Sequence, residues 1–133
     1  MTYCLDTNTV IHFFKGSGRV AERLLATPPT EVALPAVALY ELYVGIDTSS
    51  ARARRRTAFQ SFLQAVTVLP FESKAAEASA HLRKALEADG TPIGPLDVLI
   101  AGTALANRAT LVTQNVKEFS SVEGLILEDW FAR

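Results

Sequence analysis

The order of apolar and polar segments along the chain predicts strands that alternate with helices. Short apolar runs, the candidate strands, lie at 3–5, 32–34, 66–71, 110–113 and 124–130. The stretches between them carry helix-capping residues and apolar residues at helical spacing. Because this order is typical of a parallel sheet covered by helices on both faces, we expect an α/β fold, a three-layer α/β/α sandwich with a mostly parallel central sheet.

Helical spacing is clearest between Ser73 and Asp89. Ser73 is the expected N-cap of this helix, and Gly90 is expected to end it. Further helices are expected within 7–14, 16–27, 35–45, 47–65 and 94–109. No repeat or linker interrupts the pattern, and 133 residues suit a single hydrophobic core, so we expect one domain over residues 1–133.

Three carboxylates interrupt stretches that otherwise have the composition of a protein core. Asp6 ends the first predicted strand, in the region where open parallel sheets bind ligands, whereas Glu41 lies in "VALYELYVG" and Asp97 in "PIGPLDVLIAG". Each has an ordinary structural explanation: Asp6 can cap the next helix, Glu41 can reach solvent, and Asp97 can complement a helix dipole. One acid in each of three apolar contexts nevertheless favours a shared site.

Neighbouring carboxylates that are partly buried repel one another, raise one another's pKa and destabilise the fold unless a cation neutralises them. We therefore expect a raised pKa for Asp97 in the folded protein. A hard divalent cation with oxygen ligands, Mg²⁺ foremost, is the natural neutraliser, and it commonly shares its remaining positions with phosphate oxygens. The three acids thus point to metal-dependent phosphodiester chemistry.

An ordered set of short motifs resembles the PIN-domain ribonucleases, specifically the VapC toxins of bacterial type II toxin–antitoxin modules. The motifs are "LDTN" at 5–8, the acid at 41, "GPLDVLIAG" at 94–102, "LVTQNVKEF" at 111–119 and "LEDW" at 127–130. The resemblance covers essentially the whole chain and implies a PIN-like fold. It also implies that Asp6, Glu41 and Asp97 form an acidic triad that holds one or two Mg²⁺ or Mn²⁺ ions. The implied activity is endoribonuclease hydrolysis that leaves a 3′-hydroxyl and a 5′-phosphate, with tRNA or another structured RNA as the target and inhibition of translation as the result.

The fourth acidic position of that family is open in this sequence. The stretch "TQNVKEF" offers Asn115, where many PIN domains carry an Asp, and Glu118 three residues later. Either side chain is a candidate for reaching the metal, directly or through water. Thr7, Asn8 and Thr113 are candidates for hydrogen bonds that orient the carboxylates, although helix capping and turn formation are equally good explanations for them.

The densest positive charge of the chain lies in "RARRR" at 52–56. Arginine suits bidentate phosphate contacts, so the residues of this run are candidates for binding RNA, although such runs are more often solvated helix faces. The candidates are Arg52, Arg54, Arg55 and Arg56. The net charge of −1 gives no global attraction for nucleic acid.

The helix from Val37 to Val44 is more apolar than one core-facing stripe requires, which suggests a partner chain. By the resemblance, that partner is a VapB-like antitoxin whose C-terminal segment lies in an apolar groove, with Phe14, Leu39 and Tyr43 as candidates for its lining. A homodimer is also expected. Since no apolar stretch approaches the roughly 20 residues that span a bilayer, and Cys4 is the one cysteine, we expect a soluble cytoplasmic protein without membrane contact.

Two other functions fit parts of the pattern. A phosphoryl-accepting receiver domain is also an α/β sheet with an acidic magnesium pocket, but it needs an Asp at the end of a central strand, and "VTVLPFESK" at 66–74 has none. A noncatalytic RNA- or protein-binding PIN module would tolerate loss of the triad, whereas this chain keeps all three acids.

Overall fold

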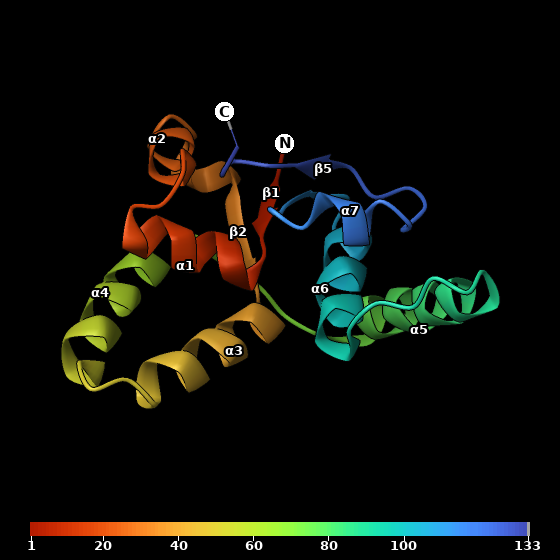
Figure 1. Ribbon diagram of the computed structural model, residues 1–133, viewed down its shortest axis with the longest axis horizontal. Coiled ribbons are helices and arrows are strands. Elements are labelled where there is room, and N and C mark those ends of the chain that lie inside the picture. Colours follow the sequence, from red (N-terminus) through yellow and green to blue (C-terminus); the bar gives the residue numbers. More distant parts are fainter. Residues whose placement is uncertain (133) are drawn as a thin grey trace.

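The structure, a computed structural model, describes residues 1–132 and contains a five-stranded sheet (Figure 1). The strands are β1 (Tyr3–Leu5), β2 (Val32–Pro35), β3 (Thr67–Leu69), β4 (Thr110–Val112) and β5 (Leu127–Glu128). They lie in the order β3-β2-β1-β4-β5, and each neighbouring pair is parallel. The predicted α/β/α sandwich is confirmed, with a sheet that is parallel throughout. Residue 133, the last of the predicted domain range, lies outside the described residues.

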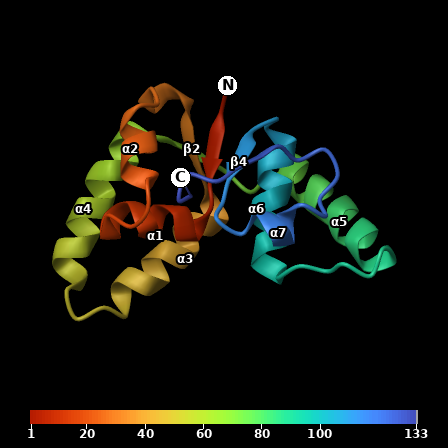
Figure 2. The same cartoon turned by 45° about the horizontal axis from the view of Figure 1, so that its top comes forward.

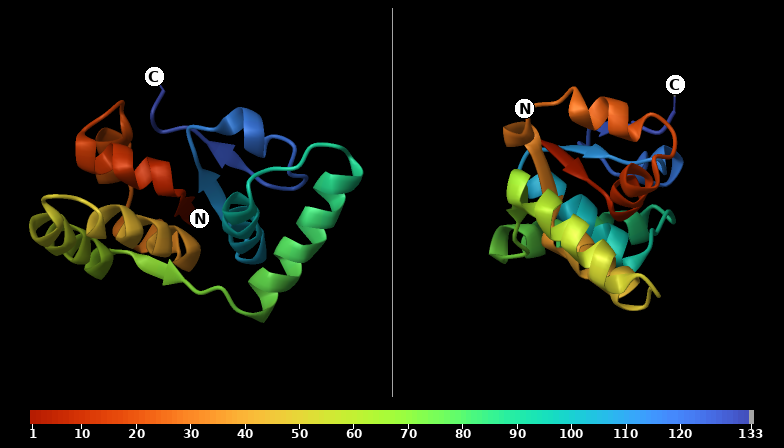
Figure 3. Two further views of the ribbon diagram at one scale, coloured as in Figure 1. Left: turned by 60° about the horizontal axis from the view of Figure 1, so that its bottom comes forward. Right: turned by 90° about the vertical axis from the view of Figure 1, so that its left-hand side faces the viewer.

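Helices connect the strands and flank the sheet. They are α1 (Thr7–Lys15), α2 (Val20–Leu25), α3 (Ala36–Asp47), α4 (Arg52–Ala65), α5 (Ser73–Ala88), α6 (Pro95–Ala106) and α7 (Val116–Phe119), with a 3₁₀ turn at Pro29–Glu31. Figures 1 and 2 show α1 to α4 gathered on one side of the molecule and α5 to α7 on the other. The left view of Figure 3 keeps this division, which follows the order of the sequence.

The three inner strands form the centre of the hydrophobic core. Leu5, Leu34 and Leu111, from β1, β2 and β4, are completely buried. Strands buried on both faces need apolar residues at successive positions, which explains why these segments read as continuous apolar runs. Burial on both faces therefore fixes the central strands in the core.

Strand β1 lies in the middle of the sheet and pairs with β2 on one side and β4 on the other. The order of strands reverses at this point, and open α/β sheets bind ligands beyond the carboxyl ends of the strands at such a reversal. Asp6 follows directly after β1 and so lies at this position. The 66–74 segment therefore does not exclude a receiver domain, contrary to expectation, because β3 is an edge strand and the central strand β1 is followed by an Asp.

Several local predictions differ from the structure. The N-cap of α5 is Glu72, which makes no side-chain capping bond, and the expected cap Ser73 is the first helical residue. Neither α7 nor the 3₁₀ turn was predicted, since elements of three or four residues are too short to show a period. Within residues 1–132, no helix combines the length and the apolar character needed to cross a membrane.

Candidate active site

Asp6 is fixed by the junction between β1 and α1. Its backbone N–H donates to the carbonyl of Val112 on β4 at 3.1 Å, and its Oδ1 accepts the N–H of Thr9 at 2.9 Å. The side chain is therefore the N-cap of α1, as its ordinary structural explanation predicts. That cap uses one carboxylate oxygen, so the capping role leaves the other oxygen available for a ligand.

Glu41 is held toward this junction from α3. Thr7, the first residue of α1, donates its hydroxyl to Oε1 of Glu41 at 2.7 Å. This contact joins residues that are far apart in the sequence and agrees with the prediction that Thr7 orients a carboxylate. Asn8, the other candidate from the same turn, has an exposed side chain.

Asp97 lies in the first turn of α6, which begins at Pro95 with Gly94 as its N-cap. Its Oδ2 is only 3.1 Å from the position that a Cβ at Gly94 would occupy, so any residue larger than glycine would crowd the carboxylate. Burial raises the pKa of Asp97 to about 6, aided first by the charge of Glu118 and a hydrogen bond to it, and then by the charges of Glu41 and Asp6. The direction of this shift is the one expected for a site shared by several acids.

Glu118, on α7, is the acid that interacts most strongly with Asp97. Its Oε1 accepts the backbone N–H of Gly94 at 3.3 Å, and its Oε2 accepts the side-chain amide of Asn115. Asn115 is in turn held by Thr113, whose buried hydroxyl accepts the N–H of Asn115 at 3.0 Å. Of the two candidates for the fourth position, the structure therefore brings Glu118 to the acids and gives Asn115 the task of holding it.

The structure thus gathers the acids around one end of the sheet without drawing them into a tight cluster. Among residues 1–132, no three His, Cys, Asp or Glu side chains stand close enough to hold a metal ion. Repulsion between carboxylates favours such spacing, and Asp6, Glu41 and Glu118 each accept a hydrogen bond from a neutral donor. In chemical type the donor set, made only of carboxylate oxygens, fits a hard divalent cation.

A groove of about 600 Å³ between α1, α3 and α4 begins at Glu41. Its lining includes Phe14, as predicted, but neither Leu39 nor Tyr43. Those two side chains are partly buried against the core, so they do not line this groove, and their contact with an antitoxin stays a prediction. On this helix, apolar character reflects packing against α4 as well as against the sheet.

The four arginines of the 52–56 run have different surroundings. Arg54 and Arg55 line the groove, whereas the guanidinium of Arg56 pairs with Asp47 at 3.0 Å and lies 4.5 Å from the ring centre of Tyr43. Arg52, the first residue of α4, is exposed and is absent from the described lining. Sequence reasoning could not separate these residues, and it missed Lys15, which also lines the groove.

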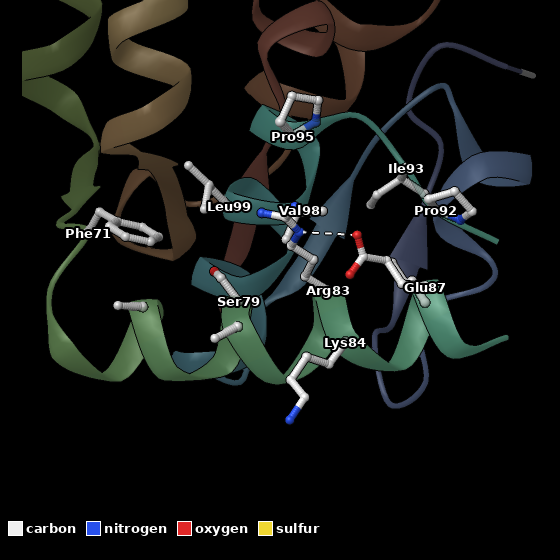
Figure 4. Close-up of a pocket in the computed structure, with 13 residues that line it drawn as sticks. Phe71, Ser79, Arg83, Lys84, Glu87, Pro92, Ile93, Pro95, Val98 and Leu99 are labelled. Atoms are coloured by element: carbon white, nitrogen blue, oxygen red, sulfur yellow. Dashed lines mark hydrogen bonds and ion pairs between the residues drawn. The ribbon is translucent and has the colours of Figure 1, made fainter. Parts of the chain in front are cut away.

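A second cleft, of about 630 Å³, lies between α5 and the start of α6 (Figure 4). Figure 4 shows mainly apolar side chains there, such as Ile93 and Val98, with Arg83 and Glu87 paired at the rim. Its described lining contains none of the four acids. The cleft is therefore separate from the candidate site.

Sequence reasoning did not predict how Glu118 is held or how burial affects Cys4. The backbone N–H of Gly94 holds Glu118, and the only sequence signal near it was the Gly-Pro pair that starts the helix before Asp97. Cys4 is completely buried in β1, and burial together with the nearby charge of Asp6 raises its thiol pKa. A thiol that stays protonated is not a nucleophile, so Cys4 takes no part in the chemistry.

Comparison with known proteins gives consistent relatives over the whole chain. The PIN domain family matches residues 3–125. The ribonuclease VapC2 of Rickettsia felis is 36% identical over 133 residues, and the tRNA(fMet)-specific endonuclease VapC of Salmonella typhimurium is 31% identical over 130 residues, each match covering 98% of both chains. Among solved structures, VapBC2 from Rickettsia felis bound to a DNA fragment from its promoter is similar with a TM-score of 0.90 at 34% identity, covering 98% of this chain and 99% of that chain.

Proposed function

The chain belongs to the PIN-domain family, and we propose that it is the toxin of a type II toxin–antitoxin module, an endoribonuclease that hydrolyses RNA phosphodiester bonds. Its relatives over nearly their full length are VapC ribonucleases. The observation that carries the proposal is the position of Asp97, where Glu118, Glu41 and Asp6 all act on one carboxyl group. A carboxyl group whose pKa is raised by burial and by neighbouring acids is a functional-site candidate, and Asp6 follows the central strand at the edge where open parallel sheets bind ligands.

We propose that Asp6, Glu41 and Asp97 hold Mg²⁺, with Mn²⁺ as a substitute, and that Glu118 lies in the fourth position. The carboxylate donor set and the mutual charge of these acids support this assignment. When bound, such a cation polarises the phosphoryl group and lowers the pKa of an attacking water.

The chain's own residues position the acids for this reaction. Thr7 restrains Glu41 by donating a hydrogen bond, and the Asn115 amide and the Gly94 N–H restrain Glu118. Donors to carboxylates fix which oxygen faces a ligand. In the proposed hydrolysis, water attacks the phosphorus and the bond to the 3′ oxygen breaks, which leaves a 3′-hydroxyl and a 5′-phosphate.

A VapB-like antitoxin is the proposed partner, because the similar solved structure is a VapBC complex. RNA is the proposed substrate, and tRNA is its proposed class, since one relative is named as a tRNA(fMet)-specific endonuclease. We also propose that the chain forms a homodimer, as expected for the family. The receiver-domain function is not retained, because the chain belongs to a different family.

The test is cleavage of total RNA by the purified, antitoxin-free chain with Mg²⁺ and with EDTA, followed by mapping of new 5′ ends. New ends should appear only with Mg²⁺ and should carry a 5′-phosphate. Asp6→Asn is the matched control, because Asn caps helices as well as Asp and so preserves the fold while removing the charge. Identical RNA profiles from the folded wild type and this variant would instead indicate a noncatalytic binding module.

A further inference from the structure

We propose that the groove between α1, α3 and α4 binds a single-stranded segment of RNA beside the acidic site, with Arg54 and Arg55 contacting its phosphates. This inference rests on the proposed nuclease function, because it locates the substrate of that enzyme. Glu41 is part of the groove's lining, so an RNA strand bound in the groove lies next to one of the candidate acids.

The charge of the groove suits a polyanion. Its described lining carries three cations, Lys15, Arg54 and Arg55, against the single acid Glu41. The whole chain has a net charge of −1, so the groove is positively charged although the protein as a whole is slightly negative. Each cation that neutralises a phosphate releases condensed counterions, which makes such a groove effective at binding RNA.

Arg54 and Arg55 are free to make these contacts. Within residues 1–132, the arginines in ion pairs are Arg19, Arg23, Arg56 and Arg83. Arg56 connects α4 to α3 through Asp47 and Tyr43, which makes it a structural residue. Its two neighbours on the same helix have no such partner in this part of the chain and keep their full charge toward the groove.

The aromatic surface of the groove favours single-stranded RNA over a duplex. Phe14 is 45% exposed, and its ring packs edge-on against Phe59 and Phe62, which restrains its orientation. Proteins that bind single strands combine cations along the backbone with aromatic rings on which unpaired bases stack. A duplex keeps its bases stacked on one another and cannot use such a ring.

The experiment measures RNA binding separately from cleavage, in the Asp6→Asn background. The probe is a fluorescein-labelled oligouridylate of about 12 nucleotides, followed by anisotropy at several salt concentrations. Removal of two phosphate contacts by Arg54→Ala with Arg55→Ala should weaken binding roughly 10- to 30-fold at about 0.1 M salt, and should reduce the salt dependence of log K by about 1.4. Alanine favours helix, so this variant is expected to fold.

The matched control removes two positive charges elsewhere. Arg83→Ala with Lys84→Ala changes exposed residues of α5 at the second cleft, and binding should stay within about two-fold because salt screens distant charges. A further variant, Phe14→Leu, keeps an apolar side chain but removes the ring. It should weaken binding of the single strand about five-fold or more and leave binding of a duplex of equal length unchanged.

Two results would overturn the proposal. In the first, the Arg54, Arg55 variant binds the probe as tightly as the control variant. In the second, that variant keeps its RNA affinity but no longer binds the antitoxin, which would assign the groove to a protein partner. Failure of the nuclease function would be seen elsewhere, as absence of RNA cleavage by the wild type with Mg²⁺, so the two failures are distinguishable.

Discussion

At Asp97 two opposite electrostatic influences act on one side chain. A negative charge in the first turn of a helix is ordinarily favourable, because it faces the positive end of the helix dipole. Here burial and three neighbouring acids outweigh that benefit and raise the pKa of Asp97 to about 6. The residue is therefore kept at a cost to stability, as functional acids commonly are.

Asp97→Asn should stabilise the metal-free protein at neutral pH and abolish RNA cleavage. The folded pKa, about 6, lies above the unfolded value of about 4, so charging Asp97 opposes folding at every pH above this window. The advantage of the variant should be full near pH 7, shrink as pH falls through 6 and disappear below about 4. Because the side chain is only partly buried, we expect about 1 kcal/mol. Thermal melts of both apoproteins across pH measure it.

A purely structural role for Asp97 predicts the opposite sign. If its charge served the helix dipole, Asp97→Asn would be less stable at neutral pH. A variant that melts below the wild type at pH 7 would remove the crowded-site explanation of Asp97.

Glu118→Gln should reduce cleavage less than Glu41→Gln. Glu118 already accepts two hydrogen bonds, from Gly94 and Asn115, and is proposed to tune a site that the other three acids hold. Asn115→Ala should have a similar small effect, since it releases Glu118 without removing its charge. Comparable losses for Glu118→Gln and Glu41→Gln in single-turnover cleavage would place Glu118 among the inner ligands.

At the scale of elements, α5 and α6 approach each other closely at Gly102. A Cβ at Gly102 would lie 1.9 Å from Oγ and 2.8 Å from the Cα of Ser79. The backbone of α5 therefore leaves no room for a side chain at this point of α6. Ser79 is buried, and its hydroxyl makes no hydrogen bond within the described residues, so its small size rather than its polarity is what the packing uses.

Gly102→Ala should destabilise the protein by about 2 kcal/mol or more, because the two helices must separate to admit a methyl group. Gly45→Ala is the matched control, since it is also a helical glycine but has nothing within 4 Å of its Cβ position. It should stabilise the protein by about 0.5 to 1 kcal/mol through helix propensity. Urea denaturation measures the free energy of unfolding of the two variants. Equal values would mean that α5 and α6 can move apart at no cost.

How far the sequence predicts this fold depends on the length of each element. The inner strands were predictable because burial on both faces leaves an apolar run, and α5 was predictable because it is long enough to show its period. The position of β3 at the edge was not, since strand order depends on contacts between distant segments. Asp6, Glu41 and Asp97 could be named because their apolar contexts are local in the sequence. The difference between Arg55 and Arg56 could not be predicted, since it depends on contacts of Arg56 with Asp47 and Tyr43 on another helix.

For the whole molecule, Mg²⁺ should raise the melting temperature of the wild type. A ligand that binds only the folded state stabilises it by about 1.4 kcal/mol at ten times its Kd, which corresponds to roughly 5 °C for a chain of this size. Asp6→Asn should show no such rise, although it keeps its helix cap. Differential scanning fluorimetry measures both, with sodium chloride of equal ionic strength as the control. An equal rise in the two proteins would indicate unspecific binding.

The division of the fold into two sides places two of the acids, Asp6 and Glu41, before the exposed 70–72 loop and the other two, Asp97 and Glu118, after it. The halves meet where β1 pairs with β4. A chain cut in this loop therefore yields two pieces that each lack two of the four candidate acids, and each piece should be harmless when expressed alone. When the two pieces are fused to two proteins that bind each other, RNA cleavage should be restored. Growth arrest of the cell then reports that the two fused proteins bind.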